Sequence, residues 1–200
     1  MKIIIITGPS GSGKSTLAKS LFDSLKNGHV LSTDNYYKTG IVSKSLSIFV
    51  KSYFDKPISL NKKLIKNDIK FILENKNISY LYKYDFILNK RTKLLKHIKR
   101  IDYLIIEGIF SLELIKFIKN KDFIFVKLKT TKKVCKERVC LRDVQERGKN
   151  KKKSLKDFKS AWNTYKKYES KYNLKKFKNL IIVKKLSDKE NILKKLSIKL

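Results

Sequence analysis

The feature that most restricts this chain is a glycine-rich segment near its N-terminus. Gly8-Pro9-Ser10-Gly11-Ser12-Gly13-Lys14-Ser15 fits the pattern G-x-x-x-x-G-K-[ST], and Thr16 follows it. An apolar run at residues 3–6 precedes the segment, and a stretch with helical periodicity comes after it. Small residues let successive backbone N–H groups curl around an anion while the next helix directs its positive end at the same point. The sequence therefore predicts a phosphate-binding loop between a buried strand and a helix.

The loop residues have separate predicted tasks. We expect the Lys14 side chain to reach the β- and γ-phosphates of a nucleoside triphosphate and the Ser15 hydroxyl to ligate Mg²⁺. ATP or GTP and Mg²⁺ are thus the expected cofactors. The predicted nucleotide-binding residues are Gly8, Ser10, Gly11, Ser12, Gly13, Lys14, Ser15 and Thr16.

Along the rest of the chain, apolar runs alternate with segments of helical periodicity, which is typical of a parallel sheet wrapped by helices. We expect an α/β fold of the three-layer P-loop NTPase class, with a central, mostly parallel sheet, helices on both faces and a lid helix. The predicted strands are 3–6, 29–32, 103–106, 123–128 and 180–183, the predicted helices are 15–26, 60–75, 130–147, 154–172 and 187–198, and a hairpin or excursion is expected at 78–91.

The chain of 200 residues contains no stretch rich in Pro, Gly or Ser that would indicate a linker. We therefore expect one domain over residues 1–200. Within it, a lid is predicted at about residues 130–150 and an acceptor-binding excursion at about 34–92. We place Phe22 on the inner face of the first helix and Leu155 on the buried stripe of the helix at 154–172.

The net charge of +32 is the strongest signal in the composition. A chain this basic attracts polyanions in a salt-dependent way, yet only five of its 49 basic residues are Arg. A reader of nucleic-acid sequence is expected to use Arg, whose planar fork contacts phosphates and base edges through two bonds at a time. Many Lys, Ile and Asn together are typical of an AT-rich genome. We expect nonspecific polyanion binding at most, and no specific nucleic-acid partner.

The apolar runs and the cysteines help to predict the cellular compartment of the protein. The N-terminal run is too short for a signal peptide, and no later run approaches the roughly 18 apolar residues of a membrane helix. Cys135 and Cys140 have neither a disulfide framework nor a metal-binding spacing. We expect a cytoplasmic protein without a membrane partner. Homo-oligomer formation is left open.

Two acids stand at the carboxyl ends of predicted strands, where ligands of open α/β sheets bind. Asp34 comes after the strand at 29–32, and Glu107 follows the strand at 103–106. One acid can help to hold Mg²⁺ through water, and the other can accept the proton of an acceptor hydroxyl. We assign the base role to Asp34, because it leads into a tyrosine-rich loop suited to an organic acceptor. Glu107 is assigned to the metal.

Three of the five arginines, Arg138, Arg142 and Arg147, fall within ten residues of one predicted helix. In a chain that otherwise uses Lys, this cluster indicates a site that needs guanidinium geometry. Arg138 and Arg142 are four residues apart and share a helix face, where a common anion would offset their repulsion.

Several motifs taken together resemble the uridine kinase family, whose neighbours include phosphoribulokinase and bacterial pantothenate kinase. The resemblance covers about residues 1–150, and its later motifs are more specific than the phosphate loop, which many NTPases share. In chain order the motifs are residues 8–16, Asp34-Asn35-Tyr36-Tyr37-Lys38, Phe54-Asp55-x-Pro57, Tyr84-Asp85-Phe86, Ile106-Glu107-Gly108-Ile109-Phe110 and Arg142-Asp143-x-x-Glu146-Arg147-Gly148.

The resemblance implies a kinase that transfers the γ-phosphate of ATP or GTP to the 5′-hydroxyl of uridine or cytidine. It implies that Asp34 is the general base, that Asp55 binds the ribose hydroxyls and that Tyr37 contacts the nucleoside. Arg142 and Arg147 would belong to a lid over the phosphates. The expected catalytic residues are Asp34, Lys14, Arg142 and Arg147, and the expected substrate-binding residues are Asp34, Tyr37, Asp55, Tyr84, Asn89, Arg91 and Arg138.

Some positions depart from the family pattern and leave alternatives open. Asn89 stands where the family usually has a His that reads the pyrimidine edge, although Arg91 matches. Val139 and Lys149 replace two arginines of the family. One alternative is a P-loop kinase of the same fold that acts on another small alcohol, such as a pantothenate- or ribulose-phosphate-like acceptor. A third possible function, suggested by the net positive charge, is that of a nucleic-acid-associated NTP-binding protein.

Overall fold

The computed structural model describes residues 1–50, 53–118 and 122–196. Its central sheet is parallel, with the strand order β2-β5-β1-β6-β7. Both faces of the inner strands are covered, which explains why those strands are nearly continuous apolar runs. The strands are β1 (Lys2–Thr7), β2 (Gly28–Ser32), β5 (Tyr103–Glu107), β6 (Phe123–Leu128) and β7 (Leu180–Val183).

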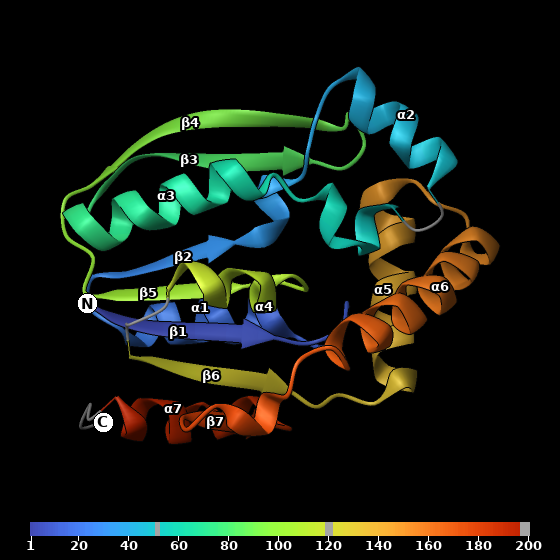
Figure 1. The fold of residues 1–200 in the computed structure, drawn as a ribbon. Helices are drawn as coiled ribbons and strands as arrows, with labels where there is room; N and C mark the ends of the chain where they lie inside the picture. Colours follow the sequence, from blue (N-terminus) through green and yellow to red (C-terminus); the bar gives the residue numbers. More distant parts are fainter. Residues whose placement is uncertain (51–52, 119–121, 197–200) are drawn as a thin grey trace.

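Alternate side chains of β1 belong to different hydrophobic clusters, as the two-residue period of a strand requires. Ile4 and Ile6 share a buried cluster with α1 (Lys14–Ser24) and α7 (Lys189–Lys195). Ile3 and Ile5 share another with α3 (Lys62–Asn75), α4 (Ser111–Leu114) and the end of α6 (Lys151–Glu169). Helices therefore cover both faces of the sheet (Figure 1).

A second, antiparallel sheet lies beyond β2 and is formed by β3 (Ile78–Asp85) and β4 (Lys90–Ile98). Together with α3 and α2 (Ile41–Phe49), this hairpin rises above the main sheet (Figure 1). Short 3-10 helices complete the chain: η1 (Thr33–Tyr36), η2 (Tyr53–Asp55), η3 (Pro57–Ser59), η4 (Ile115–Phe117), η5 (Leu174–Lys176) and η6 (Leu186–Asp188).

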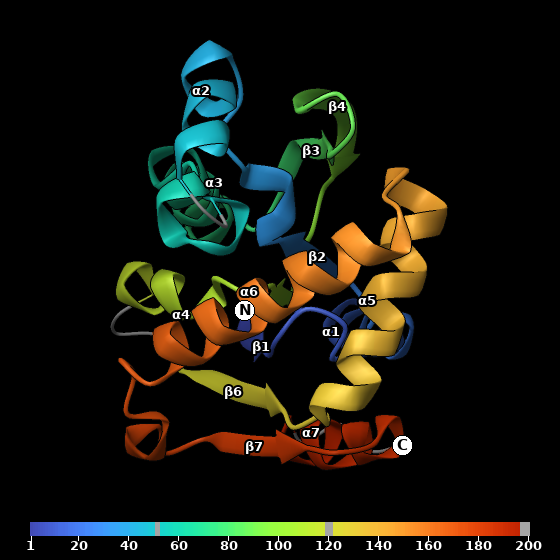
Figure 2. The same cartoon turned by 90° about the vertical axis from the view of Figure 1, so that its right-hand side faces the viewer.

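The helices α5 (Lys132–Arg147) and α6 stand at the carboxyl ends of the parallel strands (Figures 1 and 2). Each begins at a side-chain cap, because Thr131 accepts a hydrogen bond from Val134 N and Asn150 accepts one from Lys153 N. The two helices pack on each other through Cys135, Val139 and Phe158. Their position makes them part of whatever site forms at that edge of the sheet.

The predicted fold class is confirmed, whereas several details differ from the sequence-based expectation. Phe22 is 46% exposed and Leu155 is 39% exposed, so both assignments to buried faces were wrong. Each lies beside the buried stripe of its helix rather than within it, since Leu17 and Leu21 on α1, and Phe158 and Tyr165 on α6, define those stripes.

The boundaries and the number of elements also differ. The hairpin continues to Ile98, and the sequence analysis missed α2 and α4. The last helix ends at Lys195, and residues 197–200 lie outside the described residues, so the expected extension to 198 is not described. Within the described ranges, no helix combines the length and the apolar character that crossing a bilayer requires.

Candidate functional site

The glycine-rich loop connects β1 to α1. Gly11 has a φ of 77°, in the left-handed region that favours glycine. A Cβ at Gly11 would lie 2.6 Å from the carbonyl oxygen of Cys135, so the loop and α5 approach each other too closely for any side chain there. The Lys14 side chain folds back over the loop, and its Nζ donates a hydrogen bond of 3.0 Å to the Pro9 carbonyl. Burial lowers the pKa of Lys14, and the charges of Glu107 and Asp34 oppose that shift.

The carboxyl ends of β2 and β5 bring two acids next to the loop. Ser32 and Glu107 are register partners, and Ser32 Oγ donates a hydrogen bond of 2.5 Å to Glu107 Oε1. Burial and the neighbouring charge of Asp34 raise the pKa of Glu107, while Lys14 lowers it. Asp34 Oδ1 is buried and finds no hydrogen-bond partner among the described residues. A buried carboxylate oxygen without a partner is costly unless a ligand supplies one.

Gly108 allows Asp34 and Glu107 to come together. Its φ is 143°, and a Cβ there would lie 1.8 Å from Thr33 Oγ1. Only a residue without a side chain lets the start of η1 pass this close to the end of β5. The close packing at this point therefore requires glycine after Glu107, and it brings Asp34 next to the glycine-rich loop.

The residues present fit a magnesium ion held mainly by phosphates. The described residues contain no group of three or more His, Cys, Asp or Glu that could hold a metal by itself. Mg²⁺ at nucleotide sites usually takes only one or two carboxylates and keeps phosphate oxygens and waters as its other ligands. The Ser15 hydroxyl, Glu107 and the unpartnered oxygen of Asp34 provide that kind of limited donor set.

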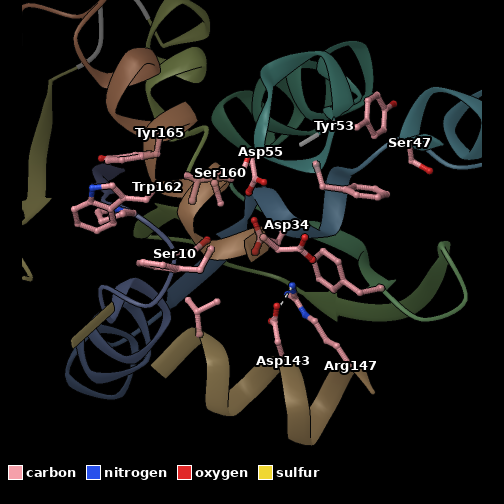
Figure 3. A pocket seen from close by; sticks show the side chains of 18 of the residues that line it. Ser10, Asp34, Ser47, Tyr53, Asp55, Asp143, Arg147, Ser160, Trp162 and Tyr165 are labelled. Atoms are coloured by element: carbon pink, nitrogen blue, oxygen red, sulfur yellow. Dashed lines mark ion pairs between the residues drawn. The ribbon is translucent and has the colours of Figure 1, made fainter. Parts of the chain in front are cut away.

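Two cavities meet at this edge of the sheet. The larger, of about 980 Å³, surrounds the loop and extends toward Lys184 and Leu186 after β7. The smaller, of about 670 Å³, lies between η1, η2, α2, α5 and α6 and is seen in Figure 3. Both volumes fall within the range of small-molecule sites. The residues that line both cavities are Ser10, Asp34, Ile109, Val139 and Arg142.

Aromatic side chains form one wall of the smaller cavity. Tyr37 is 3% exposed, and its hydroxyl donates a hydrogen bond of 3.0 Å to the carbonyl of Phe54. Burial and the nearby charges of Asp34 and Asp55 raise the pKa of Tyr37 well above its ordinary value, so the phenol stays protonated. The Tyr37 ring also makes edge contacts with Phe86 and other rings. This wall suits a flat organic group.

Charged side chains form the opposite wall. Asp143 contacts Arg142 at 2.9 Å, Lys149 at 3.1 Å and Arg147 at 3.5 Å. The Arg147 guanidinium lies 4.0 Å from the centre of the Phe86 ring and thereby faces the aromatic wall (Figure 3). These cations could receive phosphate groups that enter from either cavity.

Asp55 reaches the same cavity from η2, and burial raises its pKa to about 6 against the opposing charge of Lys149. An ionised carboxylate in this position can accept hydrogen bonds from two neighbouring hydroxyls of a ligand. Figure 3 shows Asp55, Asp34 and Arg147 among the side chains that line this cavity.

Comparison with known proteins agrees with this geometry. Residues 3–188 match the model of the phosphoribulokinase / uridine kinase family. The chain belongs to this family. Members with the name uridine kinase from Clostridium novyi (strain NT) and Bacillus pumilus (strain SAFR-032) are each 32% identical to it, over 151 and 153 residues. These alignments cover 73% and 74% of this chain and 70% of each relative.

Other matches in the phosphoribulokinase / uridine kinase family are more local. The uridine kinase from Alkaliphilus metalliredigens (strain QYMF) is 36% identical over 110 residues, and the chain spans about half of its length, 52%. A solved structure described as a possible uridine kinase from Bacillus stearothermophilus superimposes with a TM-score of 0.62. That comparison covers 90% of this chain and 88% of the other at 16% identity, so it shows the shared fold alone.

The predicted site residues of this family member fall into groups. Seven loop residues, together with Glu107 and Arg138, line the larger cavity, and Arg138 NH1 donates a hydrogen bond of 3.4 Å to the Gly11 carbonyl. Gly8 is not part of that lining. A Cβ on Gly8 would lie 2.7 Å from Ser12 Oγ, so it serves the turn itself. The predicted residues that line the smaller cavity are Ser10, Asp34, Tyr37, Asp55, Arg142 and Arg147.

Three predicted substrate contacts lie behind the cavity wall. Tyr84, Asn89 and Arg91 are not among the residues that line either cavity. The hydroxyl of Tyr84 is hydrogen-bonded to Asn89 Oδ1, and Arg91 NH1 donates a hydrogen bond of 2.9 Å to the Tyr37 carbonyl. In this conformation the three residues support Tyr37 from the hairpin.

Sequence reasoning missed Ser32 and Asp143 as parts of the site. Ser32 connects the two acids, since its Oγ also accepts a hydrogen bond of 3.4 Å from Asp34 N. Asp143 gathers the cations at the end of α5 and just after it. Asp143 was visible only as the second letter of the Arg142-Asp143 motif, which says nothing about its burial.

Proposed function

We propose that this chain is a nucleoside kinase that transfers the γ-phosphate of ATP or GTP to the 5′-hydroxyl of uridine or cytidine in the cytoplasm. The observation that carries the proposal is the position of Asp34. Its carboxylate borders both the cavity around the glycine-rich loop and the cavity with the aromatic wall, and one of its oxygens has no hydrogen-bond partner in the part of the chain that the structure describes. The family membership and the names of the relatives support the same reaction.

In the proposed reaction, the triphosphate lies along the glycine-rich loop and the nucleoside lies against Tyr37 with its ribose near Asp55. Asp34 accepts the proton of the 5′-hydroxyl, the hydroxyl oxygen forms a bond to the γ-phosphorus, and the bond to the β-phosphate oxygen breaks. Lys14 and Arg142 stabilise the negative charge on the oxygens of the phosphoryl group that is being transferred. Mg²⁺, when bound near Ser15 and Glu107, would neutralise phosphate charge.

We further propose that residues 1–200 act as one kinase domain, with about 130–150 as its lid and about 34–92 as its acceptor-binding part. Arg142 and Arg147 would close with α5 over the phosphates and exclude water, so that the phosphate reaches the nucleoside rather than solvent. The cap of α6 at Asn150 lies at the end of the lid and would move with it.

A second acceptor class is favoured by one observation. Asn89 Oδ1 is hydrogen-bonded to Tyr84 and lies outside the cavity lining, so it does not face a ligand in this conformation. Other protein groups would then have to form the hydrogen bonds to the edge of a pyrimidine. A kinase of this fold that acts on a different small alcohol is therefore the alternative.

The experiment is a direct acceptor screen. The protein is incubated with Mg-ATP and, separately, uridine, cytidine, pantothenate or ribulose 5-phosphate, and ADP release is followed. Release stimulated by uridine or cytidine alone supports the proposal, and stimulation by another alcohol supports the alternative. ATPase activity that responds to RNA but to no small acceptor would contradict both and indicate a nucleic-acid-associated NTP-binding protein.

A further inference from the structure

Asp143 is a buried acid that the proposed reaction does not use. It lies in the last part of α5, and its side chain is 4% exposed. The carboxylate accepts hydrogen bonds from Arg142 Nε at 3.3 Å and Arg142 NH2 at 2.9 Å. Its ion pairs with Lys149, at 3.1 Å, and Arg147, at 3.5 Å, place three cations around one carboxylate.

The position is unfavourable for an acid unless these partners are present. The C-terminal end of a helix carries a partial negative charge, and a buried carboxylate loses its hydration. Burial accordingly raises the pKa of Asp143. The hydrogen bond from Arg142 and the charges of Arg147 and Lys149 lower that pKa by more than burial raises it, so the net shift is downward and the acid stays ionised. The charge of Asp143 therefore depends on the cations that it gathers.

The same cations depend on Asp143. Arg142 borders both cavities, and Arg147 borders the smaller one. The guanidinium groups of Arg142 and Arg147 both contact Asp143 Oδ1, so they lie close together and repel each other, and burial and this repulsion lower the pKa of Arg147. A carboxylate between them reduces that repulsion and fixes both side chains before any phosphate is present.

We propose that Asp143 is a positioning residue that holds Arg142 and Arg147 at the junction of the two cavities and competes with the incoming phosphates for them. The inference rests on the proposed phosphoryl transfer. Because Asp143 offsets part of the positive charge, its presence weakens binding of a polyanion in the ground state. Because it fixes the guanidinium groups, it favours the arrangement needed in the transition state.

The test is Asp143→Asn, which keeps the shape of the side chain and removes its charge. We expect kcat with the best acceptor to fall by at least about 5-fold, because the arginines lose their fixed position. We expect the Kd of inorganic tripolyphosphate, measured by calorimetry on the protein without nucleotide, to fall by at least about 3-fold, because a competing carboxylate is gone. A purely structural role would instead weaken tripolyphosphate binding or leave it unchanged.

Glu137→Gln is the matched control, because it removes the same charge from an exposed position on the same helix. Both quantities should stay within about 2-fold of the wild type. Lower kcat together with tighter tripolyphosphate binding in Asp143→Asn supports the proposal, and any other combination overturns it. If the wild type phosphorylates no acceptor, the proposed function fails, and the tripolyphosphate measurement alone then decides whether Asp143 competes for the arginines.

Circular dichroism and thermal unfolding establish whether Asp143→Asn folds. If Asp143→Asn does not fold, Asp143→Glu tests the proposal instead. This variant keeps the charge and displaces the carboxylate by one methylene. A positioning role predicts a kcat at least about 3-fold lower with a tripolyphosphate Kd within about 2-fold of the wild type. A kcat equal to that of the wild type would overturn the proposal.

Discussion

Asp34 and Arg142 each border both cavities, Asp34 from η1 after β2 and Arg142 from the second half of α5. The two side chains come from segments more than 100 residues apart in the chain. Under the proposed reaction, an acceptor hydroxyl at the junction of the cavities loses its proton to the carboxylate while the guanidinium receives the phosphate charge. The two cavities thus share one carboxylate and one guanidinium group.

Asp34→Asn tests the base role. The amide keeps the size of the side chain but cannot accept the proton, so we expect kcat to fall by at least about 10²-fold with little change in ATP affinity. Steady-state kinetics and ATP titration measure the two effects. Asp23→Asn, in an exposed position on α1, is the control and should behave like the wild type. Turnover of Asp34→Asn within a few-fold of the wild type would remove Asp34 from the base role.

Lys14→Ala tests the glycine-rich loop. The buried ammonium of Lys14 donates a hydrogen bond to the loop carbonyl of Pro9, and its loss should lower kcat by about 10²-fold or more because the transition state loses a fixed positive charge. Lys19→Ala removes an exposed lysine from the same helix and should leave the rate unchanged. Unaltered catalysis in Lys14→Ala would contradict the assignment of this loop to a triphosphate.

The pKa of Asp55 predicts a pH effect on the acceptor. Burial raises this pKa from 3.8 to about 6, with Lys149 and Arg147 lowering it and Asp157 and Asp143 raising it. The ionised form accepts hydrogen bonds from ligand hydroxyls more strongly than the protonated form, in which one oxygen becomes a donor. The KM of the acceptor should therefore rise as the pH falls through about 6, and Asp55→Asn should show a high KM without that pH dependence. An equal slope in both proteins would contradict the role of Asp55.

The raised pKa of Asp55 also affects the stability of the folded protein. A carboxyl whose pKa is higher in the folded than in the unfolded protein binds its proton more tightly when folded, so its ionisation opposes folding. The stabilising contribution of the protonated form is lost as the pH rises from about 3.8 to about 6. Asp55→Asn should therefore have a higher Tm than the wild type at pH 7, measured by thermal unfolding, and the gain should shrink toward pH 4. A lower Tm at pH 7 would mean that the cations around Asp55 dominate.

Gly11→Ala tests the close approach of the loop to α5. The added Cβ would meet Cys135 O at 2.6 Å and Val139 Cγ2 at 2.9 Å, in addition to the backbone strain of a positive φ. We expect a loss of about 2–4 kcal/mol in the free energy of unfolding, from overpacking and strain together. At Gly148, where nothing lies within 4 Å of the added Cβ, Gly148→Ala should cost only the strain, about 1–2 kcal/mol. Equal losses in the two variants would show that the contact with α5 does not matter.

Local patterns in the sequence were sufficient for the fold class and the loop. The spacing of Gly8, Gly13 and Lys14 between an apolar run and a helical stretch specifies a strand, a turn and a helix that are adjacent in the chain. The positions of Asp34 and Glu107 after apolar runs were also enough to predict that both would reach the same edge, because all parallel strands end there. These inferences need only nearest neighbours and one rule of sheet topology.

The burial and direction of side chains decided the rest. The sequence alone could not indicate that Asp143 is buried among three cations, that Tyr84 uses its hydroxyl on Asn89, or that the hairpin supports Tyr37 through Arg91. Arg91 and Tyr37 are far apart in the chain, whereas Asp143 and Tyr84 bind residues near them in sequence. In every case the burial and direction of the side chain decide the contact, and periodicity does not encode them. The chain by itself therefore determined which chemical groups reach the carboxyl edge of the sheet. Only the tertiary structure decided which of them face a cavity and which are neutralised by one another, because burial arises from packing between elements that are far apart in the sequence, and burial decides which neighbouring charges must pair.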